Sequence, residues 1–254
     1  MILVFKKKTV AIVSALVAIT IIGIAIMIGI INVKPTDAST KLIPIYYVKS
    51  ESKKVALTFD AAWGADKTIG ILDILDRNDC KSTFFLTGYW IETYPDLVEE
   101  INKRGHLVAN HSANHLHMID STIDEMSKEI AYVSDKINSL IGKKCEYFRA
   151  PYGEYNNTLI KCAESYDLKV VQWNVDTLDW KGRSASDIVQ TVEQNTIDGS
   201  IILCHNDSAN ILEALPLMIV ALKNKGLSLV TLSELIIKSD YIIENDGRQI
   251  VSPK

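Results

Sequence analysis

Short apolar runs alternate with segments of helical periodicity between residues 55 and 238. The apolar runs predict strands at 55–59, 82–86, 107–109, 147–148, 169–172, 201–203 and 227–230. The periodic segments predict helices at about 67–77, 95–104, 122–140, 156–165, 185–194, 209–224 and 232–238. Seven βα units in a row predict an α/β fold built on a parallel sheet.

Polar residues that could carry chemistry stand at the C-terminal ends of the predicted strands: Asp60, His111, Arg149, Asp176 and His205. In an open sheet the ends of distant strands are separated by about 4.8 Å per strand step, whereas a closed sheet gathers them around one mouth. The first strand is also not followed by the glycine-rich turn typical of an open nucleotide-binding sheet. We therefore expect a distorted (β/α) barrel of about seven parallel strands, similar to a TIM barrel.

Two histidines, His111 and His115, are four residues apart after the third predicted strand. On a tight helical turn this spacing places both imidazoles on one side, where they could bind one divalent metal ion. The same spacing also occurs between unrelated surface or core histidines, so the pair alone does not establish a metal site.

The N-terminal segment is strongly apolar. Thr9–Val33 has 25 residues without a charge and follows Lys6–Lys8. As a helix it would be about 37 Å long, enough to cross a bilayer, and it lacks a convincing signal-peptide cleavage site. We expect residues 1–33 to be a cytoplasmic stub and uncleaved signal anchor; the alternative is a buried core helix.

The lysines before this helix favour the cytoplasmic side, which places the rest of the chain outside the cell. The expected location is thus the cell membrane, as a single-pass protein. Residues 34–52 contain Pro35 and Pro44, lack helical periodicity and are expected to be a linker. The main domain is expected at 53–240, and residues 241–254 as a C-terminal tail.

Composition and charge narrow the range of partners. The chain has 254 residues, 48% hydrophobic and 23% charged, with a net charge of −4. Because residues 1–34 carry four lysines and no acid, the rest holds 23 basic and 31 acidic side chains, a net charge of −8. Such an acidic domain is not expected to bind nucleic acid.

Four cysteines lie in the part expected to be exported: Cys80, Cys145, Cys162 and Cys204. Their spacing matches no metal-binding or redox motif, and the sequence leaves their pairing open.

Five segments in order resemble the motifs of the NodB-homology polysaccharide deacetylases, carbohydrate esterase family 4: Thr58–Asp60, His111–His115, Arg149–Gly153, Asp176–Trp180 and Leu203–His205. The resemblance covers most of residues 54–236. Within the family, residues 56–64 (ALTFDAAWG) look most like the sporulation-associated branch.

The resemblance implies removal of an acetyl group from an N-acetylated sugar. Asp60 matches the general base that takes a proton from the attacking water, and His205 matches the general acid that protonates the departing amine. His111 and His115 match the metal-binding histidines, because a divalent ion polarises the amide carbonyl and activates water. Arg149 matches the arginine that pairs with the base and keeps it ionised.

Three further residues match supporting positions. Tyr152 would offer its backbone N–H to the developing oxyanion. Asp176 would orient the acid histidine and keep it protonated. Trp180 would form a wall of the site.

One position departs from the family pattern. The third metal ligand of the family is a second acid in the first motif, and Ala61 stands there. Because catalytic zinc sites usually have three protein ligands, we expect zinc or another transition metal to be weakly held or absent. The open alternatives are that Asp60 or Asp66 binds the ion, or that solvent completes the site.

The sequence therefore favours a membrane-anchored, extracytoplasmic enzyme that deacetylates N-acetylglucosamine or N-acetylmuramic acid in peptidoglycan or a related glycan. Ala61 favours a second hypothesis, a barrel that binds glycan without hydrolysing it and has a structural role in the envelope or spore. An esterase that removes O-acetyl groups is a third.

Overall fold

The computed structural model describes residues 41–253. Within this range, no helix combines the length and the apolar character needed to cross a membrane. The expected anchor at residues 1–33 and the start of the expected linker lie outside the described residues. The chain from Leu42 onward forms one compact unit.

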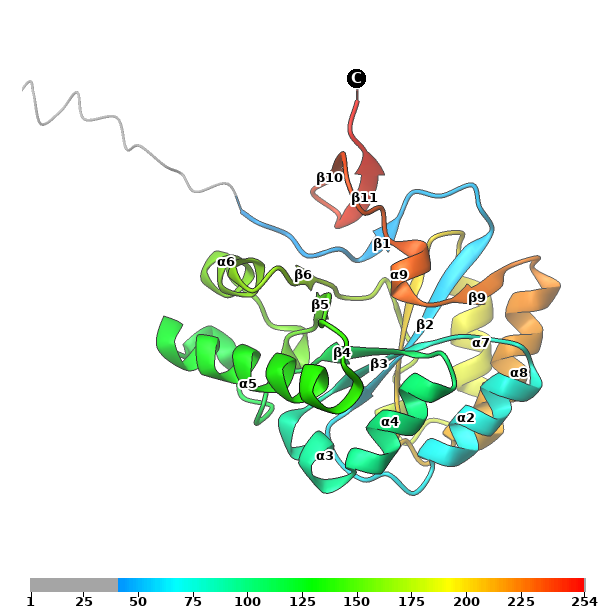
Figure 1. Cartoon of the computed structure of the whole chain (residues 1–254). Helices are drawn as coiled ribbons and strands as arrows, with labels where there is room; N and C mark the ends of the chain where they lie inside the picture. Colours follow the sequence, from blue (N-terminus) through cyan, green and yellow to red (C-terminus); the bar gives the residue numbers. More distant parts are fainter. Residues whose placement is uncertain (1–40, 254) are drawn as a thin grey trace, which may run out of the picture. The chain divides into compact units, whose positions relative to one another are not determined.

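A curved parallel sheet forms the centre of this unit (Figure 1). Its strands are β2 (Lys54–Ala61), β3 (Thr83–Leu86), β4 (Leu107–Asn110), β5 (Tyr147–Phe148), β6 (Lys169–Val170), β7 (Val175–Asp176), β8 (Ile201–His205) and β9 (Ser228–Val230). The order is β6-β5-β4-β3-β2-β8-β7, and β9 pairs with the first half of β2. All the predicted strands are present, and β7 is additional.

The barrel is not closed. β6 and β7 are the two edges of the sheet and are joined by only four residues, 171–174. Neighbouring parallel strands need a crossover of about a dozen residues, so these two strands cannot pair with each other. The expected distorted barrel is therefore a partly open one.

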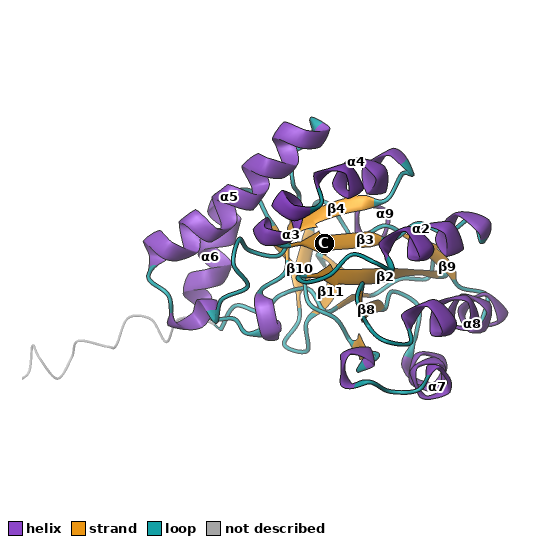
Figure 2. Ribbon diagram, turned by 90° about the horizontal axis from the view of Figure 1, so that it is seen from below, coloured by secondary structure: helices purple, strands orange, loops and turns teal. Residues whose placement is uncertain are grey.

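The predicted helices surround the strands (Figure 2). They are α2 (Thr68–Arg77), α4 (Pro95–Lys103), α5 (Ile123–Ile141), α6 (Asn157–Ser165), α7 (Ala185–Asn195), α8 (Ile211–Asn224) and α9 (Leu232–Leu235). A short helix that the sequence analysis did not predict, α3 (Gly88–Thr93), begins where the Thr87 side chain accepts a hydrogen bond from the Trp90 backbone N–H at 3.2 Å. Six residues are too few for a periodic pattern to be recognised.

Side chains along β2 point alternately to the two faces of the sheet, and the core is divided into two layers accordingly. Leu57 and Phe59 pack in the large apolar cluster that also contains helix residues, whereas Ala56 belongs to a smaller cluster with Phe85 of β3 and Ala109 of β4. Successive strand side chains point to opposite faces, which explains this separation. The same alternation leaves Asp60 on the face of Ala56, at the C-terminal end of the strand.

The segments expected to be linker and tail pair with each other instead. β1 (Tyr47–Val48), β11 (Arg248–Val251) and β10 (Tyr241–Ile243) form a second sheet in that order, with β1 parallel to β11. Ile45 and Val48 are buried, and the buried Gln249 side chain bonds to both the N–H and the C=O of Ile237. The Asp246-Gly247 turn before β11 was the available sequence signal for this hairpin.

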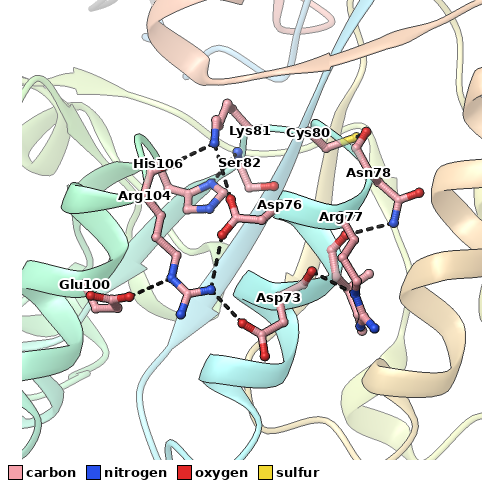
Figure 3. A network of polar contacts seen from close by, with 11 residues as sticks. Asp73, Asp76, Arg77, Asn78, Cys80, Lys81, Ser82, Glu100, Arg104 and His106 are labelled. Carbon is pink, nitrogen blue, oxygen red and sulfur yellow. Dashed lines mark hydrogen bonds and ion pairs between the residues drawn. The ribbon is translucent and has the colours of Figure 1, made fainter.

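A polar network joins α2 and α4 near the start of β3 (Figure 3). Arg104 donates to Asp73 at 2.7 Å, to Asp76 at 3.1 Å and to Glu100 at 2.7 Å. Lys81 donates to the Arg104 carbonyl at 2.7 Å. Because the network lies at the N-terminal side of the strands, it supports the scaffold and not the site.

Candidate active site

A cavity of about 650 Å³ lies at the C-terminal ends of the strands. Among its lining residues are Asp60, His111, His115, Tyr152, Trp180 and His205. These residues come from segments spread between positions 60 and 205, so the fold brings them together as the sequence analysis expected. Arg149 does not line the cavity and lies directly behind Asp60.

Asp60 is held by Arg149. Arg149 Nη1 donates to Asp60 Oδ1 at 2.6 Å and to Thr58 Oγ1 at 2.9 Å, and Nη2 donates to the Gln172 carbonyl at 3.1 Å. The guanidinium is fully buried and stacks 4.0 Å from the centre of the Phe85 ring. A planar cation fixed on several sides leaves Asp60 little freedom to rotate.

The ionisation of Asp60 follows from its neighbours. Burial alone would raise the pKa of this carboxyl group, but the charges of Arg149 and His205 oppose it, and the net pKa lies below its usual range. Asp60 is therefore ionised at neutral pH, as a general base must be.

His205 is oriented by Asp179 and not by Asp176. Asp179 is buried; its Oδ1 lies 2.8 Å from His205 Nδ1, and its Oδ2 accepts the His205 backbone N–H at 2.9 Å. Asp176 instead accepts the backbone N–H of Leu178 at 2.8 Å. That contact belongs to a left-handed turn at Leu178, φ 54°, which carries the chain round so that Asp179 meets His205.

The same carboxylate also holds Trp180. Asp179 Oδ1 accepts the Trp180 backbone N–H at 2.9 Å, and the Trp180 ring lines the cavity with 58% of its surface exposed. Trp180 thus stands at the wall where it was expected.

The proton affinity of His205 is increased. Burial would lower its pKa, but the hydrogen bond to Asp179 and the negative charge of Asp60 outweigh burial, and the net pKa is raised above its ordinary value. A histidine that keeps its proton near neutral pH can act as a general acid.

The segment that carries the histidine pair is a loop and not the expected helical turn. Ser112 and His115 have left-handed backbone angles, φ 65° and 55°. The Asn110 side chain accepts the Ser112 N–H at 2.9 Å, and this local bond competes with helix formation. The two imidazole rings still lie close, with centroids 5.0 Å apart.

These histidines do not complete a three-ligand metal site. His111 Nδ1 lies 2.8 Å from the Arg149 carbonyl, which leaves Nε2 facing Asp60 Oδ2 at 3.5 Å. Burial lowers the pKa of both imidazoles, that of His115 to about 4, so both are neutral as metal ligands must be. Ala61 is fully buried and offers no donor, and no three acidic, histidine or cysteine side chains in residues 41–253 are arranged to hold a metal.

The turn at Tyr152 presents a free backbone donor. Tyr152 is left-handed, φ 60°, and within the described residues its N–H has no acceptor. Its ring stacks on His117 at 3.9 Å and contacts His115 edge to face at 4.6 Å. The next residue, Gly153, is also left-handed, and a Cβ there would lie 2.9 Å from the Trp173 ring.

Several residues of the cavity were given no role from the sequence, among them Asp179, Trp63 and Trp173. Asp179 lies inside a motif that the analysis quoted, but only the fold shows which of its two acids meets His205. Trp63 follows the end of β2 by two residues, and its position beside a strand end was an available signal.

Known relatives agree with this geometry. The sequence profile of the polysaccharide deacetylase family matches residues 47–171. A peptidoglycan-N-acetylglucosamine deacetylase of Bacillus cereus is 38% identical over 190 residues, which cover 73% of this chain and 68% of that protein.

Solved structures include both active and inactive relatives. A peptidoglycan N-acetylglucosamine deacetylase in complex with an N-oxidanyl-benzamide aligns with TM-score 0.74 and 35% identity over 77% of this chain and 93% of that one. A family 4 pseudoenzyme from Bacillus anthracis aligns with TM-score 0.74 and 31% identity, over 78% and 70%. A mutant of that pseudoenzyme has restored enzymatic activity. From its motifs, its barrel and these relatives, the chain belongs to the polysaccharide deacetylases of carbohydrate esterase family 4.

Proposed function

We propose that this protein hydrolyses the N-acetyl groups of peptidoglycan or a related N-acetylated glycan, with Asp60 as general base and His205 as general acid. The observation that carries the proposal is the pair itself: a carboxylate with a lowered pKa and an imidazole with a raised pKa line one cavity. Pairs with opposite shifts are typical of acid and base assignments. The relatives named for peptidoglycan deacetylation supply the substrate class.

The reaction then proceeds in two steps on an acetamido group. Asp60 removes a proton from water as the water oxygen attacks the amide carbonyl carbon, and the Tyr152 N–H donates to the resulting oxyanion. His205 next gives its proton to the amide nitrogen while the C–N bond breaks. The products are acetate and the free amine of the sugar.

Deacetylases of this family generally depend on a divalent metal ion. His111 and His115 are the neutral donors that this chain offers, and the third family position is Ala61. We therefore propose that zinc or another transition metal is held weakly or is absent, and no step above depends on it.

Acetate release tests the proposal. We expect the full chain to release acetate from peptidoglycan or chitooligosaccharides, and Asp60→Asn and His205→Ala each to reduce turnover by about 10²–10⁴-fold, the contribution of general acid–base groups. Thermal melting checks that both variants fold. No acetate release by the wild type with added zinc, cobalt or manganese would exclude hydrolysis.

A second candidate is a barrel that binds glycan without hydrolysing it. It is favoured by Ala61 and by the pseudoenzyme among the similar structures. Retention of glycan in a pull-down, together with no acetate release, would support this candidate.

We further propose that the protein is anchored in the cell membrane with the deacetylase domain outside, because residues 9–33 are uncharged and follow three lysines. A role in sporulation is a proposal that rests on residues 56–64.

A further inference from the structure

A row of aromatic rings crosses the cavity and continues beyond it. We call Tyr89, Trp63, His115, Tyr152 and His117 the ring row. Successive ring centroids lie 6.0, 5.8, 4.6 and 3.9 Å apart. Its middle members line the cavity, whereas Tyr89 and His117 lie outside the lining. The row therefore extends past the cavity lining at both ends.

The end of the row formed by Trp63 and Tyr89 has no role in the mechanism. Their side chains are 59% and 53% exposed, which is unusual for large aromatic residues in contact with each other. Contiguous exposed aromatic surface beside a site is typical of a binding surface.

Trp63 is held in place by buried donors. The carbonyl of the next residue, Gly64, accepts the Trp90 indole N–H at 2.7 Å and the Asn206 side-chain amide at 2.9 Å. Trp90 and Asn206 are both buried. The loop that presents Trp63 is therefore fixed before any ligand binds, which reduces the entropy lost on binding.

Tyr89 is fixed by the start of α3. Its backbone N–H donates to the Ala113 carbonyl at 3.1 Å, and the Gly88 N–H donates to the Ser112 carbonyl at 3.0 Å. A Cβ at Gly88 would lie 2.9 Å from Ala113 Cα, so the contact between α3 and the histidine loop is as close as the backbone allows. Both exposed rings thus belong to rigid parts of the fold.

The charges around the cavity indicate what kind of polymer fits. Asp60, Asp176, Asp179 and Asp207 line it, and no lysine or arginine of residues 41–253 is in the lining. Three of these carboxylates are each paired with a cation, Asp60 with Arg149, Asp179 with His205 and Asp207 with Lys67. Among the described residues, the lining therefore offers no free cation to hold a polyanion such as a nucleic acid or polyphosphate. The flat C–H face of a pyranose ring is neutral and apolar, and it matches an exposed aromatic ring.

From these observations we propose that Trp63 and Tyr89 form a second sugar-binding subsite, on which a neighbouring sugar of a linear N-acetylated glycan stacks while the acetylated unit occupies the catalytic cavity. The inference rests on the proposed function, and it makes the protein selective for polymers over short fragments.

Binding of N-acetylglucosamine and of its hexamer, measured by calorimetry on the full chain carrying Asp60→Asn to prevent turnover, tests the subsite. We expect the hexamer to bind at least about tenfold more tightly than the single sugar, which cannot occupy both subsites at once. Tyr89→Leu and Trp63→Leu should each weaken hexamer binding about tenfold, equivalent to about 1.4 kcal/mol, and binding of the single sugar less than about twofold.

Matched variants separate stacking from general effects. Tyr89→Phe and Trp63→Phe keep a ring and should retain the preference for the hexamer. Leu217→Ala, which removes exposed apolar surface from α8 away from the row, should change neither affinity.

Two outcomes overturn the subsite alone: equal affinity of the starting protein for the single sugar and the hexamer, or an unchanged hexamer preference in Tyr89→Leu and Trp63→Leu. Loss of binding to lipid vesicles in those variants, with oligomer affinities unchanged, would assign the rings to a membrane contact and also overturn it. If the wild type neither binds any oligomer nor releases acetate, the proposed function itself fails.

Discussion

The base and the acid of this cavity have opposite proton affinities because each has one dominant partner. Arg149 stabilises the charged form of Asp60, and Asp179 stabilises the charged form of His205. Both partners are buried, so water screens these interactions weakly. Both interactions therefore favour the state with Asp60 ionised and His205 protonated.

The pH dependence of kcat/KM follows from these directions. Asp60 must lose its proton to act as base, and its lowered pKa places the acidic limb below about pH 4, the ordinary value of an aspartate. His205 must keep its proton, and its raised pKa places the alkaline limb above about pH 6.5. A rate profile on a neutral oligomer measures both limbs, and an alkaline limb below pH 6 would contradict the assignment of His205 as the acid.

Substitution of the two candidate partners of His205 provides a matched test. Asp179→Asn should move the alkaline limb to lower pH and reduce kcat by about 10²-fold, the lower end of a general acid's contribution. Asp176→Asn should move the limb much less, because Asp176 has no hydrogen bond to His205. Equal shifts in the two variants would show that Asp179 has no special role.

Metal binding can be tested at position 61. Ala61→Asp adds the missing donor, so we expect zinc affinity to rise at least about tenfold. A residue that only hydrogen-bonds to a metal ligand already changes metal affinity by about 10- to 100-fold, and a direct ligand should contribute at least as much. Because Ala61 is completely buried, the new carboxylate should lower the melting temperature without zinc and recover it with zinc. Equilibrium dialysis and thermal melting measure both effects; equal zinc affinity in the two proteins would contradict the missing-ligand explanation.

Much of the site was predictable at the level of single residues, because parallel strands gather their C-terminal ends. Asp60, His111 and His205 were found in this way. The partner of His205 was not, because Asp176 and Asp179 share one motif and only the left-handed turn at Leu178 determines which of the two acids reaches His205.

At the scale of elements, the main addition to the barrel is the small sheet of β1, β10 and β11. β1 bonds to β11 and bridges to Ser200, just before β8. Gly247 closes the turn between β10 and β11, and its carbonyl accepts the Tyr46 N–H at 2.8 Å. This small sheet therefore connects the beginning and the end of the described chain to the barrel.

Gly247→Ala should destabilise the domain by about 1–3 kcal/mol, because the residue is left-handed, φ 81°, and a Cβ there would overlap the Tyr46 ring. Gly142→Ala is the matched control: Gly142 is left-handed, φ 64°, but a Cβ there meets nothing within 4 Å. The control should cost only the backbone strain, about 1 kcal/mol. Urea unfolding measures both; equal losses would show that the contact with Tyr46 is unimportant.

The long elements were predicted closely because their patterns extend over several turns. A capping box of Thr122 and Glu125 begins α5, close to the predicted start of this helix at residue 122. The strands β10 and β11 have only three and four residues and border a charged turn, so their pattern is too short to distinguish from a tail. Their partner β1 is distant in sequence, and such pairing leaves no local signal.

At the scale of the whole molecule, the expected anchor determines where the enzyme works. We expect the full chain to sediment with membranes and a variant lacking residues 1–33 to be recovered in the soluble fraction, because residues 9–33 are uncharged. Protease added to intact cells with the outer wall removed should digest the deacetylase domain. Protection of the domain until the membrane is lysed would contradict the expected orientation.

Asp179 Oδ1 connects the wall of the cavity to the acid histidine. Asp179 Oδ1 accepts from the Trp180 backbone and lies against the ring nitrogen of His205. A ligand that displaced the Trp180 backbone would therefore also disturb the carboxylate that stabilises the imidazolium. Since such coupling is reciprocal, ligand affinity would then vary with proton concentration, and the heat of binding would differ between buffers of different ionisation enthalpy.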